Sequence, residues 1–118
     1  MTQLGNVIDT NYDFTQLPEL IHLAGVSFEN RQELIKNLKE EIEIKLIRDP
    51  KNPYDKNAIK VYVKQNKEEI QIGWIPKEIS QILAAEIDAG IKWYGKIKKI
   101  IGGEMQTKGL LVNLYYVK

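Results

Sequence analysis

With 118 residues, a net charge of +1 and no cysteine, the chain is long enough for one domain with its own core, and disulfide scaffolds, thiolate zinc sites and cysteine nucleophiles are excluded. Residues 1–11 lack the basic and apolar runs of a signal peptide, and no stretch approaches the roughly 18–20 apolar residues of a membrane span. We therefore expect a soluble, cytoplasmic protein with no membrane partner.

The beginning of the chain divides into an extension and the start of a domain. Residues 1–18 are polar and weakly patterned, so we expect an N-terminal extension that is flexible, followed by a folded domain over residues 19–118. Residues 21–28 are apolar nearly throughout, which predicts a strand buried on both faces. Asn30 and Glu33 then form a capping box for a short helix over 30–38. Its buried stripe would be Leu34, Ile35 and Leu38.

Alternation of apolar and polar residues predicts three strands in the middle of the chain, at 42–47, 59–64 and 70–74. The last two are separated by a polar turn and are expected to pair as a hairpin. Residues 48–57 hold two prolines, two asparagines and two aspartates, which is the chemistry of turns and loops.

The last third of the chain predicts one helix and two strands. Pro76 suits a first helical turn and Gly90 suits a C-terminal stop, so we expect a helix over 77–89. Its apolar stripe would be Ile79, Ile82, Leu83 and Ile87. Strands are expected at 91–101 and 110–117. The prediction is a mainly β protein with two helices and a six-stranded curled sheet or small barrel, built around Ile44, Leu46, Ile59, Val61, Ile72 and Leu83.

No complete catalytic or metal-binding pattern is present in the sequence. The single histidine, His22, lies in an apolar strand and is interpreted as a partly buried structural residue. There is no phosphate-binding glycine loop and no H-E-x-x-H. A calcium loop beginning at Asp49 is rejected, because Lys51, Pro53 and Tyr54 occupy positions that need two ligands and a glycine. We expect no metal and no cofactor.

One enzyme alternative rests on Glu43-Ile44-Lys45, which places a carboxylate and a lysine on one strand face. Metal-dependent nucleases use this spacing, but they also need a second acidic ligand, and no convincing one precedes it. Alternation alone explains a solvated face of this kind. We therefore expect the protein not to be an enzyme.

Three separated segments resemble the HIRAN domain. The first is Ala24-Gly25-Val26-Ser27-Phe28, the second runs from Arg48 to Val61, and the third joins Ile72-Gly73 to Ile75-Pro76-Lys77-Glu78. The resemblance covers about residues 21–118. It implies a modified OB-like β-barrel, and a DNA-binding role in helicase-like translocases concerned with fork remodelling or repair, or in free-standing bacterial proteins. It also implies single-stranded DNA ends as ligands and a helicase or nuclease as partner.

The resemblance further implies a set of nucleic-acid-binding residues. Phe28 and Tyr54 would stack on terminal bases. Asp55 would accept a hydrogen bond from a free 3′ hydroxyl and repel a phosphate there, and Asn52 would donate to the same terminus. Lys77, near a helix N-terminus, would face a backbone phosphate.

The same residues also have structural interpretations, which stay open. Asn52 to Asp55 is good turn chemistry, Phe28 suits a core, and Lys77 suits a solvated surface. The sequence departs from the end-binding translocase domains, which carry an arginine and paired tyrosines where this chain has Ser27, Phe28 and Glu29. Lys98 and three other residues of one strand face, Lys92, Tyr94 and Lys96, would form a compensating basic track or an ordinary lysine face.

Two hypotheses of function therefore remain. The first is a non-catalytic module that binds single-stranded DNA at a free 3′ hydroxyl end. The second is a protein-interaction or regulatory domain that keeps the fold without binding DNA ends. The sequence leaves the oligomeric state unknown.

Overall fold

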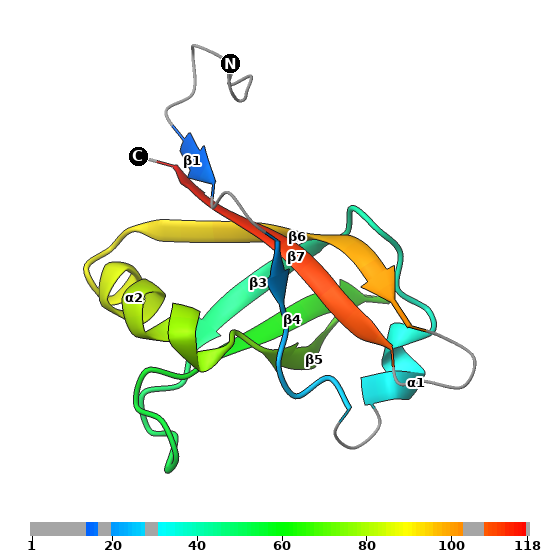
Figure 1. The fold of residues 1–118 in the computed structure, drawn as a ribbon, viewed down its shortest axis with the longest axis horizontal. Helices are drawn as coiled ribbons and strands as arrows, with labels where there is room; N and C mark the ends of the chain where they lie inside the picture. Colours follow the sequence, from blue (N-terminus) through cyan, green and yellow to red (C-terminus); the bar gives the residue numbers. More distant parts are fainter. Residues whose placement is uncertain (1–13, 17–19, 28–30, 103–107, 118) are drawn as a thin grey trace.

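The computed structural model describes residues 14–16, 20–27, 31–102 and 108–117. Seven strands and two helices lie in this part of the chain (Figure 1): β1 Phe14–Gln16, β2 Ile21–His22, α1 Arg31–Ile35, β3 Glu43–Arg48, β4 Ile59–Gln65, β5 Glu68–Trp74, α2 Lys77–Asp88, β6 Lys92–Ile101 and β7 Gly109–Val117. The strands pair in the order β1-β7-β6-β3-β4-β5, with β2 also on β7. Every pairing between them is antiparallel.

Residues 21–24 close this sheet into a barrel. Ile21 pairs with Val112 of β7. Three residues later the same segment reaches the opposite edge, where the backbones of Ala24 and Trp74 exchange two hydrogen bonds, each with an N–O distance of 2.9 Å. The ring therefore runs β7-β6-β3-β4-β5 and back to β7 through residues 21–24, which confirms the predicted small barrel. Since closure removes open sheet edges, few backbone groups are left unpaired.

The first predicted strand is shorter than expected and is buried on one face only. Ile21 and Leu23 are buried, whereas His22 and Ala24 are exposed. The expectation of two buried faces was wrong, and so was a partly buried His22, because the strand lies on the barrel wall with one side toward solvent. Gly25, at φ +72°, turns the chain away after the bridge to Trp74.

Strand β1 was not predicted. It lies in the segment interpreted as an extension, and it adds to the end of β7, with Phe14 opposite Val117. A strand of three residues is too short for its side chains to establish a period of two, so the sequence carries no alternation signal for it.

The core fills the barrel, as the alternation predicted. Five of the six predicted core residues are buried, and Leu46 packs against them while half-buried. Two helix predictions need correction. Helix α1 ends at Ile35 rather than at residue 38, and Leu34 is only half-buried. The side chain of Ile82 on α2 is 63% exposed, because Ser80, Leu83 and Ala84 form the buried face of that helix.

Helix α2 is fastened to the barrel at its C-terminal end. Arg48 donates to both carboxylate oxygens of Asp88, with N–O distances of 3.0 and 3.2 Å. Trp93 donates its indole N–H to Glu86 at 2.8 Å. The hydrogen bonding of Asp88 to Arg48 lowers the pKa of the Asp88 carboxyl below its usual range. Neither helix in the described ranges is long and apolar enough to cross a membrane.

The predicted hairpin of β4 and β5 is confirmed. Gln65 pairs with Glu68 across two residues, Asn66 and Lys67. Both adopt positive φ, 49° and 70°, as a type I′ turn requires, and such turns match the twist of the flanking strands.

Candidate functional site

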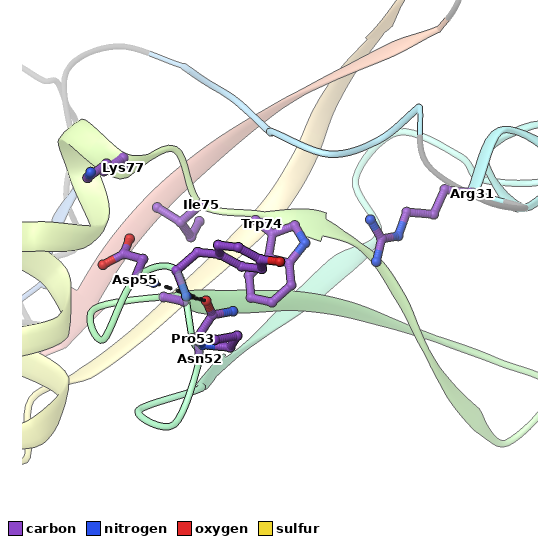
Figure 2. Close-up of a pocket in the computed structure, with 9 residues that line it drawn as sticks. Arg31, Asn52, Pro53, Asp55, Trp74, Ile75 and Lys77 are labelled. Carbon is purple, nitrogen blue, oxygen red and sulfur yellow. Dashed lines mark hydrogen bonds between the residues drawn. The ribbon is translucent and has the colours of Figure 1, made fainter.

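A hollow of about 550 Å³ lies where the loop between β3 and β4 meets the end of β5 and the start of α2. Figure 2 shows the side chains that line it. They include Asn52, Tyr54 and Asp55 from the loop, Lys77 from α2, and Trp74 and Arg31. The fold thus brings together four of the residues that the sequence singled out.

The loop is held in shape at its base. The Asp49 N–H donates to the carbonyl of Ala58 at 2.9 Å, and the Arg48 guanidinium donates to the same carbonyl at 2.8 Å. Because the other nitrogens of Arg48 hold Asp88, one side chain links the base of the loop to α2. Lys77 begins that helix, so Arg48 joins the two elements that form the hollow.

Asn52 shapes the tip of the loop from within. Its side-chain oxygen accepts the backbone N–H of Tyr54 at 2.8 Å and of Asp55 at 3.0 Å, and its amide nitrogen donates to Asp49 at 3.2 Å. This turn chemistry fixes the positions of the two residues that follow. One amide N–H of Asn52 remains for donation elsewhere, since the bond to Asp49 uses only one of the two.

Tyr54 and Asp55 are presented to solvent in different ways. The Tyr54 side chain is 92% exposed, although an aromatic ring gains most from burial. Asp55 is half-buried, and one of its oxygens accepts the N–H of Asn57 at 2.9 Å. Its second oxygen has no partner in the described part of the chain, so a carboxylate oxygen is available at the hollow.

Two charged groups lie at opposite ends of the hollow, with the Trp74 ring between them in Figure 2. Lys77 lies on the side of Asp55. It is exposed, and within the described ranges no carboxylate forms an ion pair with it. Arg31 lies beyond Trp74, and one of its terminal nitrogens donates to the Gly25 carbonyl at 2.8 Å.

Sequence reasoning missed Arg31 and gave Trp74 no role. A β-carbon on Gly25 would come within 2.8 Å of the Trp74 ring and 3.4 Å of the Arg31 guanidinium, so the turn at Gly25 packs these two side chains into place. Nothing in the spacing of Arg31 points to the hollow. Arg31 reaches the hollow only because Gly25 adopts a positive φ and the barrel closes at Trp74.

The family model of the HIRAN domain matches residues 20–108, which is most of the chain. The chain belongs to the HIRAN domain family. HIRAN domains are DNA-binding modules, so membership supports nucleic-acid binding by this chain. No curated protein matches it significantly.

Two solved structures share the fold of this HIRAN domain. A crystal structure of a protein from Lactobacillus plantarum matches with a TM-score of 0.74 and 23% identity, covering 89% of this chain and 96% of that one. The crystal structure of the HIRAN domain of human HLTF matches with a TM-score of 0.62 and 22% identity, covering 92% and 82%. At such identities the likeness establishes the OB-like fold and nothing finer.

The remaining predicted site residues are Phe28 and three residues of β6. Phe28 falls outside the described residues. Lys92, Tyr94 and Lys96 lie on β6 and do not line the hollow. One face of Tyr94 stacks on Tyr115, with ring centroids 5.8 Å apart, and Lys96 pairs in register with Glu43.

Acidic side chains balance much of the predicted basic track on β6. Lys98 forms an ion pair with Glu41 at 2.6 Å. This hydrogen bond, with smaller contributions from the charges of Lys98 and Lys96, lowers the pKa of the Glu41 carboxyl. Sequence alone does not give the register of β3 against β6, so the nearness of these acids could not be foreseen.

Within the described part of the chain, the nuclease pattern gains no acidic cluster that could hold a metal. Lys45 forms an ion pair with Glu69 at 2.9 Å, and Glu43 faces Lys96 across the sheet. Throughout the ranges that the structure describes, no group of three or more His, Cys, Asp or Glu side chains is placed to hold a metal ion.

Proposed function

We propose that this HIRAN domain binds single-stranded DNA at a free 3′ hydroxyl end and has no catalytic activity of its own. The observation that carries the proposal is the 92% exposed Tyr54 ring, which lines one hollow with Asp55 and Lys77. Among the residues that the structure describes, one Asp55 oxygen and the Lys77 ammonium have no partner. Stacking, hydroxyl recognition and phosphate binding need these three chemistries together.

We assign base stacking to Tyr54, and Trp74 lines the same hollow. A nucleobase on an exposed ring gains about 1–3 kcal/mol, and the gain is tolerant of sequence because every base has a π-face. Trp74 is only half-buried, so its ring can contact a second base or a sugar. Phe28 as a further stacking ring remains a prediction, as does a basic track of Lys92, Tyr94 and Lys96.

Recognition of the end falls to Asp55. A carboxylate oxygen accepts the hydrogen bond that a 3′ hydroxyl donates, and the same charge repels a phosphate at that position. The side-chain oxygen of Asn52 accepts the backbone N–H of Asp55 and so orients that residue, and the remaining amide N–H of Asn52 can donate to the terminus. The resulting preference is for an end over the middle of a strand.

We assign the binding of backbone phosphates to Lys77 and Arg31. Lys77 is the first residue of α2, which has 12 residues, so the helix dipole adds to the charge of its ammonium. Arg31 supplies the guanidinium that the Ser27-Phe28-Glu29 segment lacks. Its donors other than the one bonded to Gly25 are free within the described chain.

The decisive experiment compares Asp55→Asn with the wild type on oligonucleotides that end in a 3′ hydroxyl or a 3′ phosphate. Asparagine keeps an oxygen that can accept the Asn57 N–H, so the loop should hold while the charge is lost. We expect hydroxyl-ended DNA to bind about 1.5–3 kcal/mol more weakly. The 3′ phosphate should lower the affinity of the wild type for the oligonucleotide, and it should lower the affinity of the variant less. Fluorescence anisotropy measures all four affinities.

Circular dichroism of Asp55→Asn is the control for folding. If the wild type binds free, blocked and internal single strands equally, end recognition is wrong. If it binds no single strand at measurable concentration, the second hypothesis applies, and the domain is a protein-interaction or regulatory module that keeps the fold.

A further inference from the structure

A second, smaller hollow lies on the other side of the turn at residues 25–27. It has a volume of about 300 Å³, and its lining includes His22, Ser27 and Lys108. Gly25 faces the first hollow through Trp74 and Arg31, whereas its neighbours Val26 and Ser27 line the second. A turn of three residues therefore separates the two hollows.

Helix α1 fastens both sides of this turn. Arg31 holds the Gly25 carbonyl. Its neighbour Gln32 donates to the carbonyls of Val26 and Lys108, each at 3.0 Å, and accepts the Lys108 N–H at 2.8 Å. The turn is thus a fixed ridge, with a guanidinium on one side and the Lys108 side chain on the other.

The charges of the second hollow favour an anion. Lys108 is half-buried, and its ammonium has no ion-pair partner in the residues that the structure describes. No acidic side chain appears in the described lining, while the exposed His22 and Ser27 add an aromatic ring and a hydroxyl. A cation beside a ring and a hydroxyl suits a phosphate with its adjoining sugar or base.

We propose that the bound strand continues from the first hollow over the turn at 25–27 into the second, where Lys108 binds a phosphate of an internal nucleotide. This inference rests on the proposed function, because it takes Asp55 as the position of the 3′ terminus. The strand then passes Tyr54 and Trp74, leaves beside Arg31, and reaches Lys108 in the 5′ direction. The footprint of the domain is therefore longer than the terminal nucleotides.

The test compares Lys108→Gln with the wild type on a thymidine dinucleotide and a thymidine octamer, both with free 3′ hydroxyls. The variant should bind the dinucleotide as the wild type does and the octamer several-fold more weakly. Its salt dependence on the octamer should fall by about 0.7 in log–log slope, the value for one contact to a single strand. Lys64→Gln, which changes an exposed lysine of β4, is the matched control and should leave both affinities unchanged.

A neutral methylphosphonate, moved along the octamer one linkage at a time, locates the contact. At one internal linkage it should weaken the wild type and leave Lys108→Gln unaffected. If Lys108→Gln weakens binding of both oligonucleotides equally, or does not weaken binding of the octamer, the longer footprint is wrong. The proposed function would still stand in that case, provided that the wild type binds the dinucleotide with a preference for a free 3′ hydroxyl. Failure of the wild type to bind either oligonucleotide would instead overturn the proposed function, and this inference with it.

Discussion

Tyr54 gives the sharpest prediction at the level of single residues. Replacement by alanine should weaken binding of thymidine and adenosine oligonucleotides alike, by about 1–3 kcal/mol. The loss is the same for both because the ring stacks on any base and forms no base-specific hydrogen bond. Since the side chain is 92% exposed, the melting temperature should stay within a degree or so of wild type. Anisotropy and thermal melts measure the two effects.

Tyr54→Phe is the matched control, because it keeps the ring and removes only the hydroxyl. It should bind as the wild type does. A loss equal to that of alanine would mean that the hydroxyl acts rather than the π-face. An alanine variant that melts far lower would mean that the ring supports the loop.

The sequence could predict part of this site and not the rest, for identifiable reasons. Asn52, Tyr54 and Asp55 lie in one short loop, so their proximity follows from the chain itself. Lys77 needed only the expectation that a helix begins after Pro76. Arg31 and Trp74 meet through barrel closure at Ala24, a contact between segments about fifty residues apart that no local pattern encodes.

Among the elements, the bridge between residues 21–24 and β5 depends on the absence of a side chain at Gly73. A β-carbon there would come within 2.7 Å of the Ala24 carbonyl oxygen and 3.2 Å of a Val26 methyl. Gly73→Ala should therefore cost about 1–3 kcal/mol of unfolding free energy, as overpacking does. Hydrogen exchange should accelerate at the Ala24 and Trp74 amides, which form the bridge.

Gly90→Ala is the control for that prediction. Gly90 has φ +99° and no atom near its added β-carbon, so alanine adds backbone strain without moving the hollow. Both variants should lose stability, but only Gly73→Ala should also weaken DNA binding. Equal binding by the two would mean that closure does not position Trp74 and Arg31.

The link between Arg48 and Asp88 predicts a dependence of stability on pH. The pKa of Asp88 is lowered in the folded protein, chiefly by its hydrogen bond to Arg48. The ionised carboxylate therefore stabilises the fold above the ordinary aspartate pKa of about 3.9, and this contribution is lost as pH falls through the lowered folded-state pKa.

Asp88→Asn should accordingly melt below the wild type at neutral pH, and the two should converge in strong acid. Because Asp88 is exposed, the difference should be small and should shrink in high salt. Thermal melts across acidic pH measure it. Parallel profiles for the two proteins would contradict the assignment of this carboxyl.

Element prediction succeeded where side chains alternate over several residues and failed where they do not. Strands β3, β4 and β5 each place apolar residues toward the core at every second position, so the pattern marks them. Strand β1 has three residues and the first barrel segment is cut short by Gly25, so neither provides a full period. Ile82 fits the helical spacing, but the small residues Ser80 and Ala84 occupy the contact face instead.

For the whole molecule, the central prediction is that it binds without cutting. Labelled single-stranded DNA incubated with Mg²⁺ or Mn²⁺ and the protein should stay intact on a denaturing gel. The expectation rests on the failure of Glu43 and Lys45 to gather further acidic ligands among the described residues. Cleavage that disappears in Glu43→Ala, and survives in the control Glu69→Ala, would establish the nuclease instead.

The strand order of the barrel was beyond sequence reasoning. Alternation tells which residues face the core but not which strands are neighbours. Closure joins Ile21 to Val112, residues near opposite ends of the sequence. Such a pairing depends on two segments that are far apart in the chain, so the local pattern of either segment does not reveal its partner.

The pairing of β1 with the end of β7 determines how this domain can be attached to anything else. Phe14 and Val117 lie opposite each other, so two tethers would leave from one spot, and in Figure 1 the loop between β3 and β4 lies on the far side of the molecule from it. Neighbouring ends of this kind allow a module to be inserted into a surface loop of a host protein or to be circularly permuted. An affinity tag or an immobilising anchor joined directly before Phe14 or after Val117 would likewise leave the loop facing outward.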